Sequence, residues 1–410
     1  MSLIVYAIPL FLGLMLLEMA VARAIQAPVY RFHDAVTSIH IGFVSELFRS
    51  ATKLVSVVVY ATLVQQVASF EWNTRQPAVW IVAFFMYDFF YYWAHRCGHE
   101  INLMWASHVV HHSSEDFNLS TALRQSWTNQ VFYWIFYLPM AMVGIPVEVF
   151  VVTALASAVY QFWVHTRLID RLGWMERIFV TPSNHRVHHG RNAYCIDRNY
   201  GGTLIIWDRL FKTYAAERRD EPVVFGTLVP IRSWSPVWAN VKNYLGIAQQ
   251  AMRLSGWRQR LQLVFAPPGS VPLPGTSPEP LDGVAFETPT TRLQKLYAVF
   301  AVVGLLVGVL DLLLASPALA MPLRLGLTLA AALATVPLAW VFEGRKGAVP
   351  LEAARCIAML GPLAAGLWYH PVSPLWQAMA AVWLAVSLTV LAALARQPAA
   401  AVAAPLGEAP

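Results

Sequence analysis

Charged residues are scarce in this sequence. Aspartate, glutamate, lysine and arginine together supply 13% of the 410 residues, whereas a soluble domain usually carries about 25%. Hydrophobic residues supply 57%, and the mean hydropathy is +0.50. This composition excludes an ordinary soluble domain and indicates an integral membrane protein. The net charge is only +6, and the basic residues lie mostly between apolar stretches. They indicate membrane topology rather than a nucleic-acid-binding surface, so no nucleic-acid partner is expected.

Cysteine is also scarce, and several catalytic motifs are missing. Cys97, Cys195 and Cys356 form no Cys-x-x-Cys pair, which argues against a disulfide framework or a zinc ribbon. Cys97 stands between two histidines, but we expect a small buried residue there rather than a metal ligand. The sequence has no Gly-x-Ser-x-Gly elbow, no phosphate-binding glycine-rich loop and no His-Glu-x-x-His. Serine hydrolase, nucleotide-binding and zinc protease chemistry therefore find no support.

Apolar runs long enough to cross about 30 Å of hydrocarbon recur along the chain. The first has its basic residues only after it, which favours a retained span over a cleaved signal peptide. A longer apolar region, 131–163, is broken at Gly144-Ile145-Pro146, which predicts two helices folded as a hairpin. The fold class is therefore all-α, a polytopic helical membrane protein. We expect spans near residues 3–20, 52–70, 78–94, 296–315, 325–342, 353–368 and 375–394.

Three parts follow one another along the chain. Residues 1–290 are expected to form a membrane-embedded catalytic domain with its core at about 80–230. Within it, the polar stretch from 166 to about 292 predicts a soluble cap. A proline-rich linker at 267–290 leads to a C-terminal transmembrane helical region, 291–396. The alanine- and proline-rich end, 397–410, predicts a disordered tail.

Basic residues give one consistent topology. Arginines or lysines follow the first apolar run, flank the first histidines, fill residues 166–292 and recur at Arg345 and Lys346. Placing all of them on the cytoplasmic side satisfies the positive-inside rule. The sequence therefore predicts a multi-pass protein with its histidines at the cytoplasmic face. Its composition, rich in alanine, leucine and proline, favours a bacterial source and hence a bacterial inner membrane.

Nine of the 12 histidines fall between residues 95 and 189. They form one His-x3-His cluster and two His-x2-His-His clusters, with one histidine standing between them. On a helix, positions i, i+3 and i+4 share one face, so the members of each cluster can reach the same ion or two neighbouring ions. Neutral imidazole is the commonest protein ligand for zinc, iron and copper. The predicted ligands are His95, His99, His108, His111, His112, His165, His185, His188 and His189.

The number of these histidines predicts two metal ions. A tetrahedral site needs about four ligands, so nine histidines suit two ions with four or five ligands each. Sites built from imidazole fit iron, zinc or copper and argue against magnesium and calcium. We expect His33, His40 and His370, which stand alone, to be ordinary polar residues.

Two carboxylates near the clusters are catalytic candidates. Glu100 follows His99 directly and is predicted to be a ligand, an acceptor that orients an imidazole, or a proton carrier. Asp88 lies seven residues before His95, inside the apolar run 84–93. An aspartate buried in a membrane span is costly, which makes it a functional candidate.

The motifs around the clusters resemble those of a known family. Three histidine clusters of these spacings, on the cytoplasmic side of a helical membrane protein, resemble the fatty acid hydroxylase/sterol desaturase superfamily. The sequence is most similar to its alkylglycerol monooxygenase branch at YYWAHRCGHE, WASHVVHHSSEDFNLSTALRQS, YQFWVHT, TPSNHRVHHGRN, YCIDRNY and GGTLIIWD. The resemblance covers about residues 80–230.

This resemblance implies an activity and its cofactors. The eight clustered histidines would hold two iron ions, and the glutamate matching Glu100 would be required. Tetrahydrobiopterin would supply electrons, and O2 would be used to hydroxylate the carbon next to the ether oxygen of a membrane lipid, an alkylglycerol. The resulting hemiacetal would break down into a fatty aldehyde and a glycerol derivative.

Two other functions remain open from the sequence. The same site on a sterol, fatty acid or carotenoid would give a hydroxylase or desaturase that needs a separate electron-donor protein, because no fused haem or flavin domain is visible. A metal carrier or transporter is a different class. It predicts histidines inside several mid-membrane spans, whereas here the clusters stand at span ends and in polar segments.

Overall fold

The computed structural model describes residues 4–270, 278–315, 318–368 and 370–397. Within these residues all regular elements are helices, apart from two isolated bridges that join Phe179 to Leu204 and Gly190 to Phe225. This confirms the all-α fold class. The elements are α1 (Ile4–Ala24), α2 (Phe32–Val67), α3 (Pro77–Glu100), α4 (Asn102–His112), α5 (Leu119–Ala122), α6 (Asn129–Tyr133), η1 (Trp134–Tyr137), α7 (Leu138–Val143), α8 (Val147–Trp163), η2 (Gly173–Arg177), α9 (Pro182–His188), α10 (Ile206–Leu210), α11 (Pro236–Arg253), α12 (Trp257–Phe265), α13 (Arg292–Ala315), α14 (Met321–Leu333), α15 (Val336–Phe342), α16 (Ala348–Ala364) and α17 (Pro374–Ala395).

Three helical segments of the described chain are long and apolar enough to cross a membrane: Arg292–Ala315, Met321–Phe342 and Pro374–Ala395. They coincide with the spans predicted at 296–315, 325–342 and 375–394. A fourth crossing results if the two halves of α2, bent by 43°, count as one span. Residue 3 lies outside the described residues, and the rest of predicted span 3–20 falls on α1. Predicted span 78–94 falls on α3, and neither helix is among these three segments. Predicted span 353–368 corresponds to the 17-residue α16, which ends earlier, at Ala364.

The helix at 52–70 begins about 20 residues earlier than predicted, at Phe32. Polar residues between 33 and 49 made this stretch unlike a membrane span. In the folded chain several of them are buried against polar partners. Asp34 lies 3.3 Å from Arg124 in an ion pair, and Ser45 donates a hydrogen bond to the carbonyl of Ser126 at 3.1 Å. Their cost of burial is thereby offset, and the helix continues through them.

The predicted helical hairpin at 131–163 is present. Its first arm is broken into the short pieces α6, η1 and α7, and its second arm is the continuous helix α8. The turn contains Gly144 with φ of 95°, a backbone conformation that a side chain would strain. A Cβ at Gly144 would also lie 2.1 Å from the carbonyl oxygen of Phe70.

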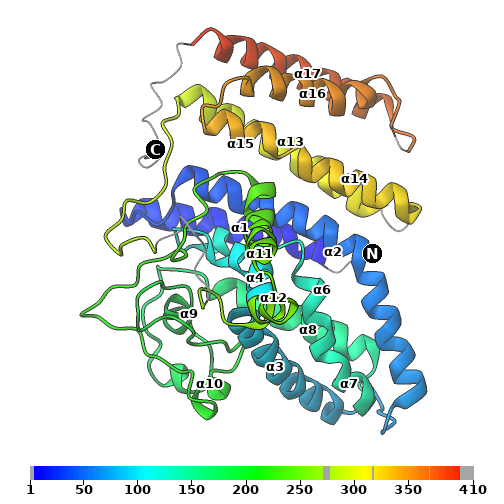
Figure 1. Ribbon diagram of the computed structural model, residues 1–410. Coiled ribbons are helices and arrows are strands. Elements are labelled where there is room, and N and C mark those ends of the chain that lie inside the picture. Colours follow the sequence, from blue (N-terminus) through cyan, green and yellow to red (C-terminus); the bar gives the residue numbers. More distant parts are fainter. Residues whose placement is uncertain (1–3, 271–277, 316–317, 369, 398–410) are drawn as a thin grey trace.

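The C-terminal helices pack on the first half of α2. Phe43 and Leu47 of α2 share a buried cluster with Leu305 and Leu312 of α13. Figure 1 shows α13 to α17 as layers above α1 and α2, while α3, α7 and α8 lie on the other side. The histidine-bearing segments therefore lie on the opposite side of α2 from the C-terminal helices.

The described part of the proline-rich stretch before α13 is attached to the N-terminal part of the chain. The Phe286 amide donates to Glu115, Trp234 donates to the Thr288 hydroxyl at 2.9 Å, and His33 contacts Glu287. The domain boundary near residue 290 stays a prediction. The predicted disordered tail lies, apart from Gln397, outside the described residues.

Candidate metal centre

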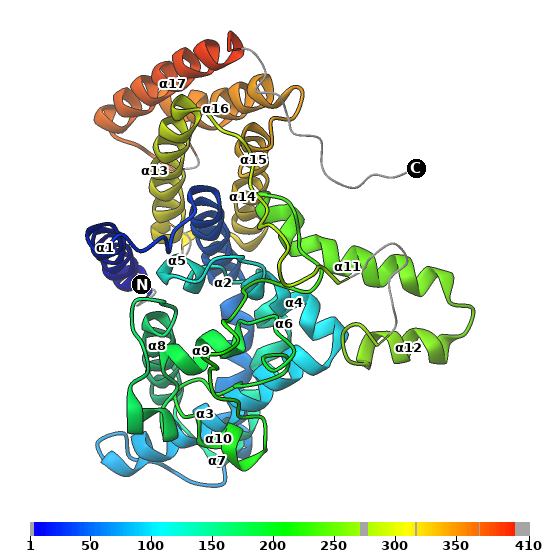
Figure 2. The same cartoon turned by 90° about the vertical axis from the view of Figure 1, so that its left-hand side faces the viewer.

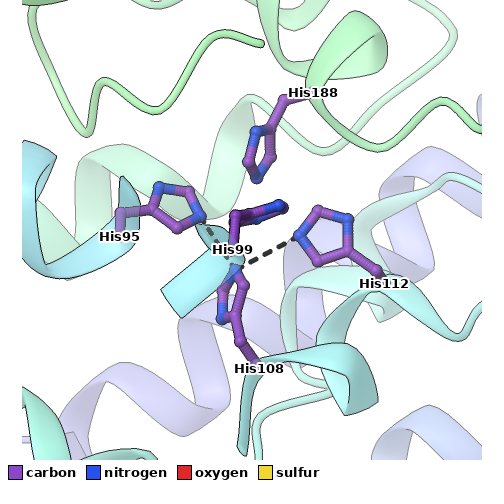
Figure 3. Close-up of side chains that lie close together, drawn as sticks. All are labelled: His95, His99, His108, His112 and His188. Atoms are coloured by element: carbon purple, nitrogen blue, oxygen red, sulfur yellow. Dashed lines mark hydrogen bonds between the residues drawn. The ribbon is translucent and has the colours of Figure 1, made fainter. Parts of the chain in front are cut away.

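The nine histidines come together in two buried groups. The five-histidine group contains His95, His99, His108, His112 and His188, and the four-histidine group contains His111, His165, His185 and His189. In each group, one ring nitrogen from every member lies within 4.8 Å of those of all the others. Figure 3 shows the five-histidine group, whose rings point toward one centre from α3, α4 and α9.

Each His-x2-His-His cluster is divided between the two groups. In α4, His108 and His112 belong to the five-histidine group, while His111 joins the other. In the second cluster, His185 and His189 belong to the four-histidine group, while His188 crosses to the five-histidine group. The i and i+4 side chains stay together because they lie one above the other, and the i+3 side chain is rotated toward the second centre.

Local sequence explains how the helices present these rings. α9 has Pro182 at its first turn, and the Thr181 side chain accepts a hydrogen bond from the Asn184 amide, which is a favourable helix start. His165 lies just after α8, where its Nδ1 contacts the Gln161 carbonyl at 2.8 Å. His165 is thus the one histidine of the four-histidine group that belongs to none of the three sequence clusters.

The nitrogen spacings fit a bound cation. Two imidazole nitrogens at about 2.0–2.1 Å from one ion lie roughly 2.8–3.4 Å apart at bond angles of about 90–110°. In the five-histidine group, Nε2 of His108 lies 2.8 Å from Nε2 of His95 and 3.2 Å from Nε2 of His112. In the other group, Nε2 of His185 lies 2.9 Å from Nε2 of His165 and 3.2 Å from Nε2 of His189.

Backbone carbonyls fix the orientation of several rings. Nδ1 of His95 contacts the Tyr200 carbonyl at 2.8 Å, and Nδ1 of His188 contacts the Arg198 carbonyl at 2.9 Å. A carbonyl only accepts, so each Nδ1 carries the proton and each Nε2 presents a lone pair to the centre. This is the outer-shell arrangement that metal-bound histidines commonly have.

Two Nε2 atoms of the five-histidine group, and also Nδ1 of His108, make no hydrogen bond with the described residues. The two Nε2 atoms are those of His99 and His188, and both are buried. A buried unpaired polar atom costs about 1–3 kcal/mol, so such atoms indicate a missing partner. A metal ion would accept both lone pairs, and a donor set made only of imidazoles suits iron, zinc or copper.

Burial keeps these rings neutral. Removal from solvent, with repulsion from neighbouring imidazoles, lowers the pKa of His111, His185 and His189 well below 6.5. Burial likewise lowers the pKa of His188 to about 4 and that of His165 to about 3. Neutral imidazole is the form that binds metal, so the site is ready for metal at physiological pH.

A cavity of about 240 Å³ opens onto both groups. His108 of the five-histidine group, and His111 and His165 of the four-histidine group, form one wall of it. Apolar side chains from α1, α2 and α8, among them Phe11 and Ala158, form other parts of the wall. Sequence reasoning did not identify this cavity, because its residues are scattered over several helices and match no motif.

One polar group in the cavity wall was also missed. The Tyr133 hydroxyl is buried without a hydrogen-bond partner among the described residues, and the ring lies 6.1 Å from the ring of His108. Gly98 makes room for this hydroxyl, since a Cβ there would lie 2.1 Å from it. Tyr133 is thus a donor without a partner among the described residues, beside His108 of the five-histidine group.

The two predicted catalytic carboxylates lie outside both histidine groups. Asp88 is buried and accepts hydrogen bonds from the Thr203 amide at 2.7 Å, the Leu204 amide at 3.0 Å and Nε1 of Trp207 at 3.0 Å. Glu100 is 38% exposed at its side chain and pairs with Arg96 at 2.9 Å. Their catalytic roles stay predictions. Cys97 is half-buried and is also in neither group.

The histidines that we expected to be ordinary lie elsewhere. His33 contacts Glu287, and His370 lies 3.0 Å from Asp311. Neither belongs to a histidine group.

Comparison with known proteins places the chain in a family. The fatty acid hydroxylase family profile matches residues 80–213, which contain all nine histidines. The alkylglycerol monooxygenase of Xenopus tropicalis is 38% identical over 361 residues, 85% of this chain and 79% of that protein. The alkylglycerol monooxygenase of Homo sapiens is 42% identical over 301 residues, 72% of this chain and 67% of that protein.

A shorter match links the chain to a bacterial protein. The ornithine lipid hydroxylase OlsE of Rhizobium tropici is 29% identical over 160 residues, 38% of this chain and 48% of that protein. No solved structure matches the chain. Together with the histidine groups, these similarities show that the chain belongs to the fatty acid hydroxylase family of membrane oxidoreductases and is a homologue of alkylglycerol monooxygenase.

Proposed function

We propose that this protein is an O2-dependent monooxygenase that cleaves alkylglycerols. It would hydroxylate the carbon next to the ether oxygen, and the hemiacetal would break down into a fatty aldehyde and a glycerol derivative. The observation that carries this proposal is the cavity of about 240 Å³ whose wall contains histidines of both groups. The identity to alkylglycerol monooxygenases over most of the chain supports this choice of substrate.

The nine histidines are the proposed ligands of two iron ions. The five-histidine group would hold one ion and the four-histidine group the other, which matches the usual number of ligands per ion. When bound, a pair of irons supplies the O2 activation and electron transfer that an unactivated C–H bond requires. One oxygen atom enters the lipid, and the other leaves as water with two electrons and two protons. A reductant, for which we propose tetrahydrobiopterin, supplies the electrons.

The protein's own residues position the substrate and keep water away. Apolar residues of the cavity, such as Phe11 and Phe162, would hold the alkyl chain by excluding water from it. The unpartnered Tyr133 hydroxyl would donate a hydrogen bond to an oxygen of the lipid. Burial of His111 and His165 at the cavity wall keeps the reacting carbon out of bulk solvent.

The chain is a multi-pass membrane protein, and we propose that the histidines lie on its cytoplasmic side. In Figure 1 the start of α13 and the end of α17 lie on the same side of the molecule as α9 and α10. Arg292, Lys295 and Arg396 stand at these helix ends. This clustering of basic residues on one side supports the assignment by the positive-inside rule. We propose a bacterial inner membrane as the location.

The test is an assay of the purified, iron-loaded protein with a 1-O-alkylglycerol, a tetrahydropterin and labelled O2. We expect a fatty aldehyde that carries one labelled oxygen before exchange with water, and no product from His111→Ala. Full activity of His111→Ala would contradict the proposal. Product that forms only with a ferredoxin or cytochrome donor, and only from a sterol or fatty acid, would instead favour a hydroxylase of that kind.

A further inference from the structure

α11 and α12 form a helical arm, residues 236–265, with an unusual charge. The arm contains Lys242, Arg253, Arg258 and Arg260 and no aspartate or glutamate. The three arginines are exposed. A surface with only positive charge is complementary to a negatively charged one. The partner of the arm is therefore expected to be negatively charged.

The exposed side of the arm is also apolar. On α12, Trp257, Leu261 and Phe265 are 66%, 48% and 62% exposed and stand four residues apart, so they share one face. On α11, Trp238, Leu245 and Met252 are exposed and stand seven residues apart, again on one face. A soluble surface seldom presents such continuous apolar stripes, and they mark an interaction site.

The basic residues flank the apolar face of α12. Successive helical residues are turned by about 100°, so Arg258 and Arg260 lie on the two sides of the stripe formed by Trp257, Leu261 and Phe265. The Arg258 guanidinium lies 5.4 Å from the centre of the Trp257 ring. This is the pattern of a helix that buries its apolar face in the headgroup region and extends its arginines to phosphate.

The opposite side of the arm is fixed to the rest of the protein. Asn102, the first residue of α4, donates through its side chain to the Leu263 carbonyl at 3.1 Å, and through its backbone amide to the carbonyl of Ala266, just past the arm, at 2.9 Å. Asn240 accepts a hydrogen bond from the Trp127 amide at 3.0 Å. Since α4 carries three of the candidate ligands, the arm is attached directly to the helix of the metal centre.

The direction of the arm fits a membrane surface. Figure 1 shows α1 and the first half of α2 lengthwise and α11 and α12 end-on, while Figure 2 shows the reverse, with the arm projecting from the body. The arm therefore lies crosswise to these two N-terminal helices. The first half of α2 belongs to the bent pair that counts as a possible fourth crossing. A helix that lies crosswise to a membrane-crossing helix runs along the plane of the bilayer.

We infer that the α11–α12 arm lies on the bilayer surface, with its apolar face among the headgroups and its arginines on anionic lipid phosphates. The arm then holds α4 and its histidines at the depth of the membrane surface. This inference does not depend on the proposed substrate. Its partner is the anionic lipid of the membrane in which the protein is embedded.

The test uses the full-length protein in vesicles of phosphatidylcholine with roughly 30% phosphatidylglycerol. A nitroxide is attached to Leu261→Cys on the apolar face or to the neighbouring exposed position in Gln262→Cys, and labelled parent protein corrects for Cys97. We expect the ratio of accessibility to O2 over accessibility to a water-soluble nickel complex to be at least about threefold higher for Leu261→Cys. Arg258→Gln with Arg260→Gln should lower this ratio in anionic vesicles.

Equal ratios at the two labelled positions would overturn the inference. So would shielding of Leu261→Cys from both reagents that persists in detergent micelles, because that result would mean a protein partner or a second copy of the chain. An unchanged ratio in the double arginine variant would overturn the part of the inference that names anionic lipid.

Discussion

Nε2 of His111 lies 3.2 Å from Nε2 of His165, although 54 residues separate them. Nδ1 of His111 lies 3.2 Å from the Arg124 carbonyl, and Nδ1 of His165 lies 2.8 Å from the Gln161 carbonyl. Both Nε2 atoms therefore present lone pairs to one another in a buried site. Two facing lone pairs repel unless a cation lies between them, so this pair supports a metal position within the four-histidine group.

Because the histidines are divided into a five-histidine and a four-histidine group, the metal content of single His→Ala variants can be predicted. His111→Ala leaves three ligands in the four-histidine group and all five in the other. We expect metal content to fall from two ions per chain to about one. His188→Ala should have a smaller effect, because four ligands remain in its group. Elemental analysis of purified protein measures this, with His370→Ala as the control that keeps both ions. A His111→Ala protein with two tightly bound ions would contradict the division.

Removal of the metal should make the protein sensitive to acid. In the folded metal-free chain, burial lowers the pKa of His188 to about 4 and that of His165 to about 3, against about 6.5 in an unfolded chain. Between these values the unfolded state binds more protons, so stability falls as the pH falls from about 6.5 toward 4. We expect the melting temperature of chelated protein to drop over this range. A melting temperature that does not change with pH would refute this.

Metal-loaded protein provides the comparison for the acid experiment. Bound metal stabilises the folded state by mass action and blocks protonation of its ligands. The metal-loaded protein should melt at a higher temperature than the chelated protein. Its melting temperature should also stay unchanged down to a lower pH. Equal curves for the two forms would mean that no metal binds at these histidines.

Asp88 allows a direct test of a structural role against a catalytic one. Asp88→Ala removes the acceptor of three N–H groups, two of them buried and one part-buried. We expect a loss of about 3 kcal/mol or more in unfolding free energy, with activity lost in parallel. Asp88→Asn keeps one oxygen and should retain part of both. An Asp88→Asn protein with the native melting temperature and no turnover would instead support catalysis by this carboxylate.

The Tyr133 hydroxyl should affect substrate binding more than stability. Tyr133→Phe removes a hydroxyl that has no hydrogen-bond partner among the described residues, so the melting temperature should hardly change. Loss of one hydrogen bond to the lipid should raise KM for an alkylglycerol about fivefold. Tyr137→Phe is the comparison variant, since Tyr137 shares a hydrogen bond with Tyr87 and does not itself line the cavity, so its loss should affect the melting temperature more than KM. An unchanged KM in Tyr133→Phe would exclude this contact.

Narrowing the cavity should select against long substrates. Ala158 of α8 lines the cavity, whereas Ala156 on the same helix is exposed and does not. Ala158→Phe should lower kcat/KM for a long-chain alkylglycerol at least about tenfold by filling the space for the chain. Ala156→Phe should leave it near the parent value. Equal activity of both variants would place the substrate elsewhere.

Much of the site could be predicted from the sequence because helical spacing is local information. The clusters at His95, His108 and His185 fix which side chains share a helix face. The length and hydropathy of α13 and α17 likewise fix them as spans. The start of α2 could not be predicted, because its polar residues find partners only in distant parts of the chain, such as Arg124 for Asp34.

The sequence by itself determined the kind of ligand, its number and the membrane setting. Only the tertiary structure decided how the ligands are divided. In the folded chain His111 lies with His185 and His189, whereas His188 lies with His108 and His112. His165, just after α8, completes the four-histidine group. The tertiary structure also forms the cavity and places Tyr133 in it. The physical reason is that helix periodicity acts within one segment, whereas the meeting of α3, α4, α8 and α9 depends on packing between segments.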